Sequence, residues 1–440
     1  MSIMVKPAQE TPQKILHLSK LDMIIRAPKT HTDEFFIYDK PPPSKLSLYF
    51  NAEILKNTLS KILVPYYPLA GRLQLNQNRD RYEINCNAMG ALFIETETNL
   101  TLKYLNETNL TLKYLNGFEP SAALRELLIP ECDYTRDLCL IPLSMVQVTW
   151  FKCGGFGLGF ALHHHVADGP AHAEFVVKFL TLVAGFDIPI SPVHDRFHVA
   201  PRDPLCIKYQ HVHEFDPIVS SLPSNGFTTG DQIYDTAQSL LKISKQQIQV
   251  LKHATLSQAM KYTNNNNHKI STFAIIASHI WRSACNARDI PHDQEVKLYI
   301  PVDGRSRLKD PVMPETYFGN VIFFAICIAK AGDVIHRPIW YTASKIQDST
   351  EKMDDESTHK IMYSDLKINL WVKFPFYKAD FGWGPPKVVR TCEIKVEGLS
   401  FLIDGPDGDD GLTLAINLFS VHIPMFKNHL YSFMPTNSSL

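Results

Sequence analysis

The chain has 440 residues and a mass of 50.0 kDa. At about 150 residues per domain, this length predicts two or three folded units and excludes a single small module. Forty-four Lys and Arg residues against 45 Asp and Glu residues leave a formal net charge of −1, and 45% of the residues are hydrophobic. The composition is typical of a compact globular protein and excludes a global field that attracts nucleic acid or anionic lipid.

Cysteine spacing and hydropathy indicate the cellular compartment of the protein. The eight cysteines include no CxxC pair, and most lie in apolar stretches, where a thiol behaves as a small hydrophobic group. The N-terminal 20 residues lack the uninterrupted apolar core of a secretory signal, and no stretch reaches the roughly 18 apolar residues that a membrane span needs. We therefore expect a cytoplasmic protein that binds small molecules, not membranes or nucleic acid, and acts as a monomer.

Hydrophobic periodicity predicts interleaved helices and strands in the first half of the chain. A helix capped by Asn51 ends at Pro65. Short strand-like patterns follow over 81–94 and 143–161, and Pro170 opens another helix.

Proline and histidine are concentrated over 188–225, a composition that suits a crossover between domains. We therefore predict an N-terminal domain over 1–187 and a C-terminal domain over 226–440. In the second half, Ser271 is placed to cap a helix. Two strand patterns follow it, over 297–302 and 321–329.

A decapeptide, ETNLTLKYLN, occupies 97–106 and recurs without a mismatch over 107–116. A single short tandem copy is not a repeat architecture, which needs several units to share a core. Lengthening a loop in this way costs little closure entropy, on the order of 0.6 kcal/mol per doubling. We predict a tolerated surface protrusion.

Three consecutive histidines and an aspartate follow the apolar run over 156–162. They stand at a strand end, where α/β architectures present side chains to a cleft. In one interpretation His164 is a general base and Asp168 holds the turn that orients it. In a second the histidines bind a metal, although only His163 and His165 would share a side of a strand. In a third they are core histidines with internal hydrogen bonds and no chemistry.

Other strings carry weaker signals. The glycine-rich stretch over 154–159 has GxG spacing but continues into a strand, so it favours close backbone packing over a phosphate cradle. No GxSxG elbow or P-loop occurs. The string DFGWG over 380–384 places two aromatic residues between glycines, which is more typical of a packed loop than of a ligand site.

Together, these strings resemble the BAHD family of acyl-CoA-dependent acyltransferases, whose hallmarks are an HxxxD motif in mid-chain and DFGWG near the C-terminus. Here they stand in that order at 164–168 and 380–384. Further family-like segments are YPLAGRL over 67–73, PVDGRSR over 301–307 and YFGN over 317–320. PAQETP over 7–12 and QVTWFKCGG over 147–155 resemble the hydroxycinnamoyltransferase branch, which uses coumaroyl- or caffeoyl-CoA. The resemblance is to the shikimate- and quinate-using members of this branch in particular.

The resemblance implies an α/β protein of two chloramphenicol-acetyltransferase-like domains. Each would hold a mixed β-sheet with flanking helices, and a long crossover loop would join them, with a solvent channel between the domains. His164 would lie in that channel. Asp168 and Gly169 would be structural, with Arg305 as the partner of Asp168.

The resemblance also implies that DFGWG has an architectural role, as it has in the family. The corresponding residues here are Asp380, Gly382, Trp383 and Gly384. We expect Asp380 to pair with Arg288.

The resemblance implies that the chain moves a hydroxycinnamoyl group from CoA to a hydroxyl or amine, within phenylpropanoid specialised metabolism. His164 would remove the proton from the acceptor as it attacks the thioester, without a covalent enzyme intermediate. Acyl-CoA would be a co-substrate, and no cofactor or metal would be permanently bound. Cations and helix N-terminal amides would hold the CoA phosphates. The candidates are Ser271, Thr272, Arg305 and Arg307.

The acceptor site departs from the family pattern. In shikimate- and quinate-using members an arginine binds the acceptor carboxylate, but Glu356 stands at the matching place here, and a carboxylate cannot hold a carboxylate. The acceptor candidates are Glu356, His359 and Trp371. Three explanations stay open: the acceptor is something else, such as an aromatic alcohol or an amine that Glu356 attracts; a gap shifts the alignment; or a deletion in this region weakens activity. In the simplest interpretation Glu356 is a solvated surface charge. The alternative function is a weakened or inactive BAHD-fold protein that binds a ligand or partner.

Overall fold

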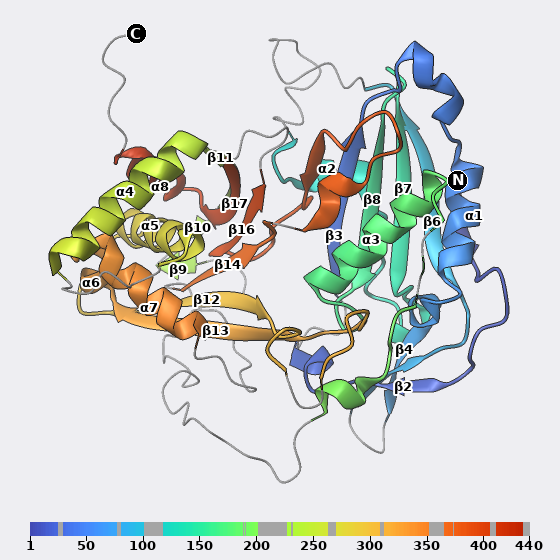
Figure 1. The fold of residues 1–440 in the computed structure, drawn as a ribbon, viewed down its shortest axis with the longest axis horizontal. Helices are drawn as coiled ribbons and strands as arrows, with labels where there is room; N and C mark the ends of the chain where they lie inside the picture. The colour runs from blue at the N-terminus through green and yellow to red at the C-terminus, as the bar shows by residue number, and fades with distance from the viewer. Residues whose placement is uncertain are drawn as a thin grey trace. The chain divides into compact units, whose positions relative to one another are not determined.

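The chain forms two compact units, each containing a mixed β-sheet with helices (Figure 1). This is the predicted α/β class with two domains. The computed structural model describes residues 1–24, 30–76, 81–100, 118–187, 189, 191–200, 227–229, 232–262, 270–308, 312–351, 365–372, 374–404 and 411–433. Most of the predicted crossover, most of the repeated decapeptide, Glu356 and His359 lie outside the described residues.

Both units are discontinuous in sequence. Unit 1 comprises Met1–Cys206, Asp303–Ile322 and Lys373–Glu393, and unit 2 comprises Ile207–Val302, Phe323–Val372 and Ile394–Leu440. The prediction of contiguous domains over 1–187 and 226–440 was therefore wrong for two segments of the second half, one of which carries DFGWG. The physical reason is strand pairing, because β15 (Val388–Arg390) pairs antiparallel with β3 (His31–Tyr38) of the first half.

In the described residues, the main sheet of unit 1 has six strands in the order β1-β6-β7-β8-β3-β15. Besides β3 and β15, its strands are β1 (Ser2–Val5), β6 (Ala91–Thr98), β7 (Ser144–Phe151) and β8 (Phe156–His163). A smaller sheet has the order β2-β5-β4, with bounds Ile15–His17, Arg81–Asn85 and Arg72–Asn76. The α-helices are α1 (Ala52–Ile62), α2 (Ala122–Leu128) and α3 (Gly169–Val183). Short 3-10 helices include η1 (Asp22–Ile24), η2 (Pro43–Leu48), η3 (Tyr67–Ala70), η5 (Leu138–Leu140), η6 (Arg196–Val199) and η7 (Pro375–Lys378).

Strand β8 is the centre of unit 1, because all eight of its residues are buried. Its two faces are covered by different helices. On one face the ring of Phe160 meets that of Phe179 from α3, with centroids 5.7 Å apart. On the other face the glycines let α2 approach, and a Cβ at Gly159 would lie 1.8 Å from the carbonyl oxygen of Leu128. The glycine-rich stretch therefore serves close packing, as predicted.

In the described residues of unit 2, the main sheet has the order β11-β17-β16-β14-β12-β13. The bounds are β11 (Thr236–Ile243), β17 (Leu412–Phe419), β16 (Leu399–Asp404), β14 (Leu366–Leu370), β12 (Glu295–Asp303) and β13 (Ile322–Lys330). A separate ribbon pairs β9 (Phe227–Thr229) with β10 (Gln232–Tyr234). The helices are α4 (Lys245–Tyr262), α5 (Thr272–Ala287), α6 (Ala331–His336), α7 (Ile339–Glu351) and α8 (Ile423–Tyr431).

A single large hydrophobic core joins the sheet of unit 2 to its helical layer. Leu366 and Ile368 of β14 belong to this core together with Trp281 of α5 and Ile346 of α7. Since side chains alternate along a strand, the residues between them face away from the core. As predicted, Ser271 caps α5, because its side chain accepts a hydrogen bond from the Ala274 amide at 3.2 Å.

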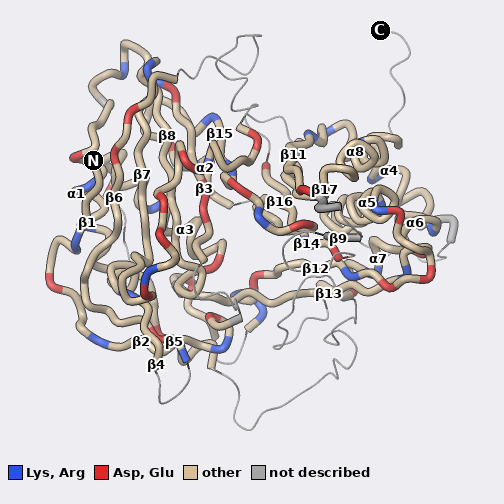
Figure 2. Tube along the Cα trace, turned by 180° about the vertical axis from the view of Figure 1, so that it is seen from behind, with Lys and Arg blue, Asp and Glu red and all other residues tan. Residues whose placement is uncertain are grey.

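The distribution of charged and apolar residues in the structure agrees with the balanced composition of the chain. Basic and acidic residues are interspersed along the trace of each unit (Figure 2). In the part of the chain that the structure describes, no helix has both the length and the apolar character of a membrane span.

The two glycines of β8 that face α2 differ in what an added methyl group would meet. In Gly159→Ala the Cβ meets a backbone carbonyl, which cannot move without the helix, whereas in Gly157→Ala it meets the Leu128 Cδ2 atom at 2.7 Å, the end of a flexible side chain. We expect Gly159→Ala to lower stability by about 3 kcal/mol and Gly157→Ala by about 1 kcal/mol. Thermal unfolding of the two variants tests this, and equal losses would contradict the described packing.

Candidate active site

Only one of the three consecutive histidines is accessible. Strand β8 ends at His163, and the chain turns through His164 and His165 before α3 begins. His163 and His165 are buried, at 0% and 1% exposure, whereas His164 is half-buried. Of the three histidines, only His164 is therefore accessible to a molecule from outside the chain.

The two buried histidines belong to the core. The His165 amide donates to Nδ1 of His163 at 3.3 Å, and the ring of His163 lies 5.0 Å from that of His31. Burial, with a smaller contribution from His164, lowers the pKa of His165 to about 4, so this ring is neutral at pH 7. Among the described residues, no group of three or more His, Cys, Asp or Glu side chains is arranged to hold a metal ion.

Asp168 is fully buried and accepts four hydrogen bonds. As the N-cap of α3, its Oδ1 accepts from the Ala171 amide at 3.0 Å, and its Oδ2 accepts from the Val321 amide at 2.8 Å. Both terminal nitrogens of Arg305 donate to the carboxylate at 2.9 Å. The predicted pairing of Asp168 with Arg305 is confirmed, and it is bidentate, which fixes direction as well as distance.

A second buried carboxylate, Asp22, holds the turn that carries His164. Its Oδ2 accepts from Nε of Arg196 at 2.9 Å, and its Oδ1 accepts from Nδ2 of Asn320 at 2.9 Å. These two side chains then donate to the turn, Asn320 to the carbonyl of His164 at 2.9 Å and Arg196 to that of Val166 at 3.3 Å. The sequence analysis missed all three side chains. Only Asn320 lies in a segment it quoted, YFGN.

Another ionisable pair is buried between α3 and β3. Nε2 of His172 lies 2.9 Å from Oε1 of Glu34, and both side chains are at most 3% exposed. Nδ1 of His172 lies 3.2 Å from the Thr32 hydroxyl. Burial raises the pKa of Glu34, against the opposing influence of His172. The pair fixes the first turns of α3 on the sheet.

The four residues predicted to bind the CoA phosphates lie in two different units. Ser271 and Thr272 stand at the N-terminus of α5 in unit 2, whereas Arg305 and Arg307 belong to unit 1. Arg307 is exposed. Arg305 is already engaged, because Nη1 also donates to Asp303 at 3.0 Å and Nη2 to the Gly319 carbonyl at 2.9 Å. The geometry gives Arg305 a structural role, and phosphate binding by the other three residues stays a prediction.

The DFGWG string packs into unit 1 as an aromatic loop. The Phe381 ring lies 5.3 Å from that of Trp383 and 4.8 Å from that of Tyr38. Nε1 of Trp383 donates to the Asp39 carbonyl at 3.2 Å. These contacts confirm that the string is architectural.

The predicted partner of Asp380 was wrong. Arg288 donates to both carboxylate oxygens of Glu397, at 2.8 and 2.9 Å. Asp380 instead closes its own loop, because its Oδ1 accepts from the amides of Gly382 at 2.7 Å and Gly384 at 2.8 Å. Both glycines have positive φ, 91° and 134°, which brings their amides round the carboxylate.

Of the acceptor candidates, only Trp371 is described. It directly follows β14, where its amide donates to the Leu402 carbonyl at 2.8 Å, and its ring lies 4.9 Å from that of Phe401. It is half-buried. Acceptor binding by Trp371 stays a prediction.

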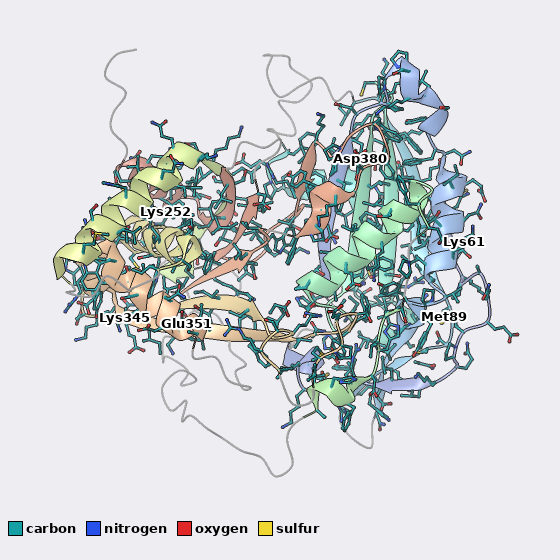
Figure 3. All side chains as sticks on the ribbon, in the orientation of Figure 1. Lys61, Met89, Lys252, Lys345, Glu351 and Asp380 are labelled. Carbon is teal, nitrogen blue, oxygen red and sulfur yellow. The ribbon has the colours of Figure 1, made fainter. Side chains whose placement is uncertain are left out.

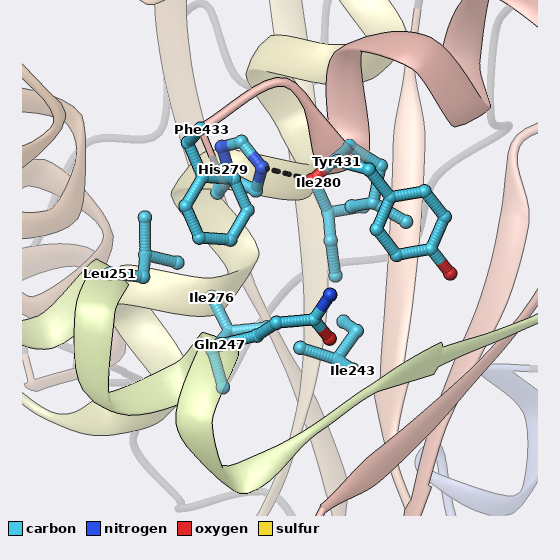
Figure 4. A pocket seen from close by; sticks show the side chains of 9 residues that line it. Ile243, Gln247, Leu251, Ile276, His279, Ile280, Tyr431 and Phe433 are labelled. Atoms are coloured by element: carbon cyan, nitrogen blue, oxygen red, sulfur yellow. Dashed lines mark hydrogen bonds between the residues drawn. The ribbon is translucent and has the colours of Figure 1, made fainter. Parts of the chain in front are cut away.

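A small apolar pocket lies within unit 2 (Figure 4). Its lining includes Leu251, Ile276 and His279, and Nε2 of His279 lies 2.9 Å from the Leu430 carbonyl. Burial lowers the pKa of His279 to about 4, so the ring is neutral. None of the predicted site residues lines this pocket.

Comparison with known proteins identifies the family of the chain. The model of the Transferase family matches residues 1–433. Anthranilate N-benzoyltransferase protein 2 of Dianthus caryophyllus is 41% identical, and shikimate O-hydroxycinnamoyltransferase of Nicotiana tabacum is 36% identical, each alignment covering 98% of both chains. The crystal structure of vinorine synthase shares the fold, with a TM-score of 0.70, 21% identity and coverage of 99% of this chain and 98% of that one. The chain belongs to the BAHD family of transferases.

The Asp168–Arg305 pair can be tested by removing the cation. Arg305→Ala leaves the buried carboxylate of Asp168 without its main compensation, so we expect stability to fall by about 3 kcal/mol. Transferase activity should fall with it, because the same carboxylate caps α3 next to the His164 turn. Thermal unfolding and turnover are the measurements, with Arg307→Ala as the control for stability. Normal folding and activity of Arg305→Ala would contradict this role.

Proposed function

We propose that the chain transfers an aromatic acyl group, benzoyl or hydroxycinnamoyl, from a CoA thioester to an amine or hydroxyl acceptor. The support from comparison is that relatives 41% and 36% identical over nearly their whole length carry those activities in their names. The observation that carries the proposal is His164, the one half-buried member of the His163–His165 run, on a turn held by Asp22 and Asp168.

The imidazole of His164 acts as the general base. It takes the proton from the acceptor nitrogen or oxygen as that atom attacks the thioester carbonyl. The tetrahedral oxyanion then collapses, the carbon–sulfur bond breaks, and the proton leaves with CoA as its thiol. Because the thioester is already activated, direct transfer needs no covalent enzyme intermediate.

An aromatic amine is the favoured acceptor. The three relatives at 41% identity are all named anthranilate N-benzoyltransferases, whereas the relative at 36% is named for transfer to shikimate. The alternative of an inactive binding protein has no feature in its favour, since His164 and the buried groups that hold its turn are in place. Transfer from benzoyl-CoA and coumaroyl-CoA to anthranilate, shikimate, quinate and tyramine, followed by release of free thiol, tests the proposal. No release with any pair would overturn it.

His164→Ala should lower kcat by about 10² to 10⁴, because general-base catalysis contributes that much. Acyl-CoA binding should persist, since Asn320 and Arg196 hold the turn through its backbone carbonyls. Thiol release measures the first effect and titration with acyl-CoA the second. His253→Ala, an exposed histidine of α4, is the control. Retention of most turnover by His164→Ala would defeat the assignment.

Three further predictions from the sequence belong to this proposal. They are a cytoplasmic location, a monomeric state and a role in phenylpropanoid metabolism. Cell fractionation, a sizing measurement and metabolite profiling would test them in turn.

A further inference from the structure

Asn320 joins a buried carboxylate to the turn that carries His164. The residue is 2% exposed, and its Nδ2 donates to Oδ1 of Asp22 at 2.9 Å and to the carbonyl of His164 at 2.9 Å. A side-chain amide carries two hydrogens on this nitrogen, so both bonds form at the same time. All three residues belong to unit 1, and the whole chain of hydrogen bonds therefore lies within one unit.

The main chain of His164 is held from two sides. Its amide donates to the Thr30 carbonyl at 3.1 Å, directly beyond the ladder in which β8 pairs with β3. Its carbonyl accepts from Asn320. The first bond ties the residue to the main sheet of unit 1, and the second ties it to the segment Asp303–Ile322. Because the place of the imidazole follows from the place of its main chain, loss of the second bond gives the ring more freedom.

The orientation of the Asn320 amide decides whether this second bond exists. With Nδ2 toward the His164 carbonyl the contact is a hydrogen bond, whereas Oδ1 in the same place would bring two acceptors together. The two ends of the amide have nearly the same shape, so packing alone does not choose between them. The choice is made by Asp22, because an ionised carboxylate only accepts hydrogen bonds and so requires Nδ2 on its side.

The carboxylate of Asp22 is itself fixed through its other oxygen. Oδ2 accepts from the amide and the hydroxyl of Ser19, each at 2.9 Å, and from Nε of Arg196 at 2.9 Å. Oδ1 faces Asn320, from whose main-chain amide it also accepts at 3.2 Å. Both oxygens are needed as acceptors, which only a carboxylate provides.

This arrangement makes the charge at position 22 necessary as well as its shape. In Asp22→Asn the oxygen stays where the donors of Ser19 and Arg196 converge, so the new NH₂ group faces the two donors of Asn320. Donors that face one another lose their hydrogen bonds, so the Asn320 amide turns its oxygen toward position 22. That oxygen then also faces the His164 carbonyl, and the turn loses its donor although no atom has been removed from the packing.

We propose that Asp22 and Asn320 are positioning residues of the transfer reaction: the charge of Asp22 sets the orientation of the Asn320 amide, and this amide sets the place of His164. The inference rests on the proposed function, in which His164 takes the proton from the acceptor. Neither positioning residue is assigned a contact with a substrate. Their loss therefore slows the chemical step and leaves substrate binding unchanged, because a displaced general base transfers the proton less efficiently.

The kinetic test uses two substitutions that preserve shape, Asp22→Asn and Asn320→Asp. The second places a carboxylate oxygen against the His164 carbonyl. With the most active pair from the thiol-release assay, each variant should lower kcat by roughly 10- to 100-fold, because a displacement of about 1 Å can cost that much. KM for the acyl-CoA and for the acceptor should stay unchanged. A rise in KM at unchanged kcat would overturn the proposal.

A double-mutant cycle tests whether Asp22 acts through Asn320. Asn320→Ala removes the amide and with it the orientation that Asp22 imposes. In that background Asp22→Asn should change kcat by less than about threefold, since the coupled effect is already lost. Equal losses in the two backgrounds would mean that Asp22 supports the fold independently of Asn320, and would overturn the proposal.

Two controls separate this effect from lost stability and from lost charge. Glu397→Gln weakens another acid–arginine pair, that with the buried Arg288 of unit 2. Glu351→Gln removes one negative charge from the exposed end of α7 (Figure 3). Glu397→Gln should lower the unfolding temperature, as Asp22→Asn does, and both controls should retain the kcat of the wild type. A loss of kcat in Glu397→Gln as large as that in Asp22→Asn would contradict the inference.

Hydrogen exchange tests the same chain of bonds without turnover. The His164 amide should exchange roughly tenfold faster in Asp22→Asn and in Asn320→Asp than in the wild type, the factor expected for loss of one hydrogen bond from the turn. The two controls should not show this increase. Faster exchange supports the positioning role even if no acyl transfer is detected with any pair, which would refute the proposed function alone. Unchanged exchange overturns the inference, whatever the turnover.

Discussion

The buried carboxylate of Asp168 is the interaction on which the geometry around His164 depends. A buried carboxylate without donors costs several kcal/mol, so the groups that donate to it are held together. Those groups come from three places: the Ala171 amide of α3, the Val321 amide and the guanidinium of Arg305. The segment Asp303–Ile322 therefore stays with unit 1, although the strands on either side of it belong to the sheet of unit 2.

Asp22 extends the same principle to the turn itself. Asn320 and Arg196 donate to Asp22 and also to the carbonyls of His164 and Val166. The backbone of the turn is therefore held, while His164 is half-buried. These hydrogen bonds position the turn through its backbone carbonyls.

The parts of this architecture that follow from local sequence were predictable. The caps Asn51 and Ser271 and the end of β8 before α3 agree with the structure. The pairing of Asp168 with Arg305, 137 positions apart, also agrees, but it was expected from the family resemblance and not from local sequence. The misses are long-range. Asp22 meets Asn320 across 298 positions of the chain, and no local pattern marks either partner. Arg288 was paired with the wrong carboxylate because motif order carries no information on which of several acids a buried arginine reaches.

The hydrogen bonding of Asp168 identifies it as a charge that supports the fold. Every oxygen of Asp168 is satisfied by the chain, so this group cannot bind a substrate without breaking the packing around α3.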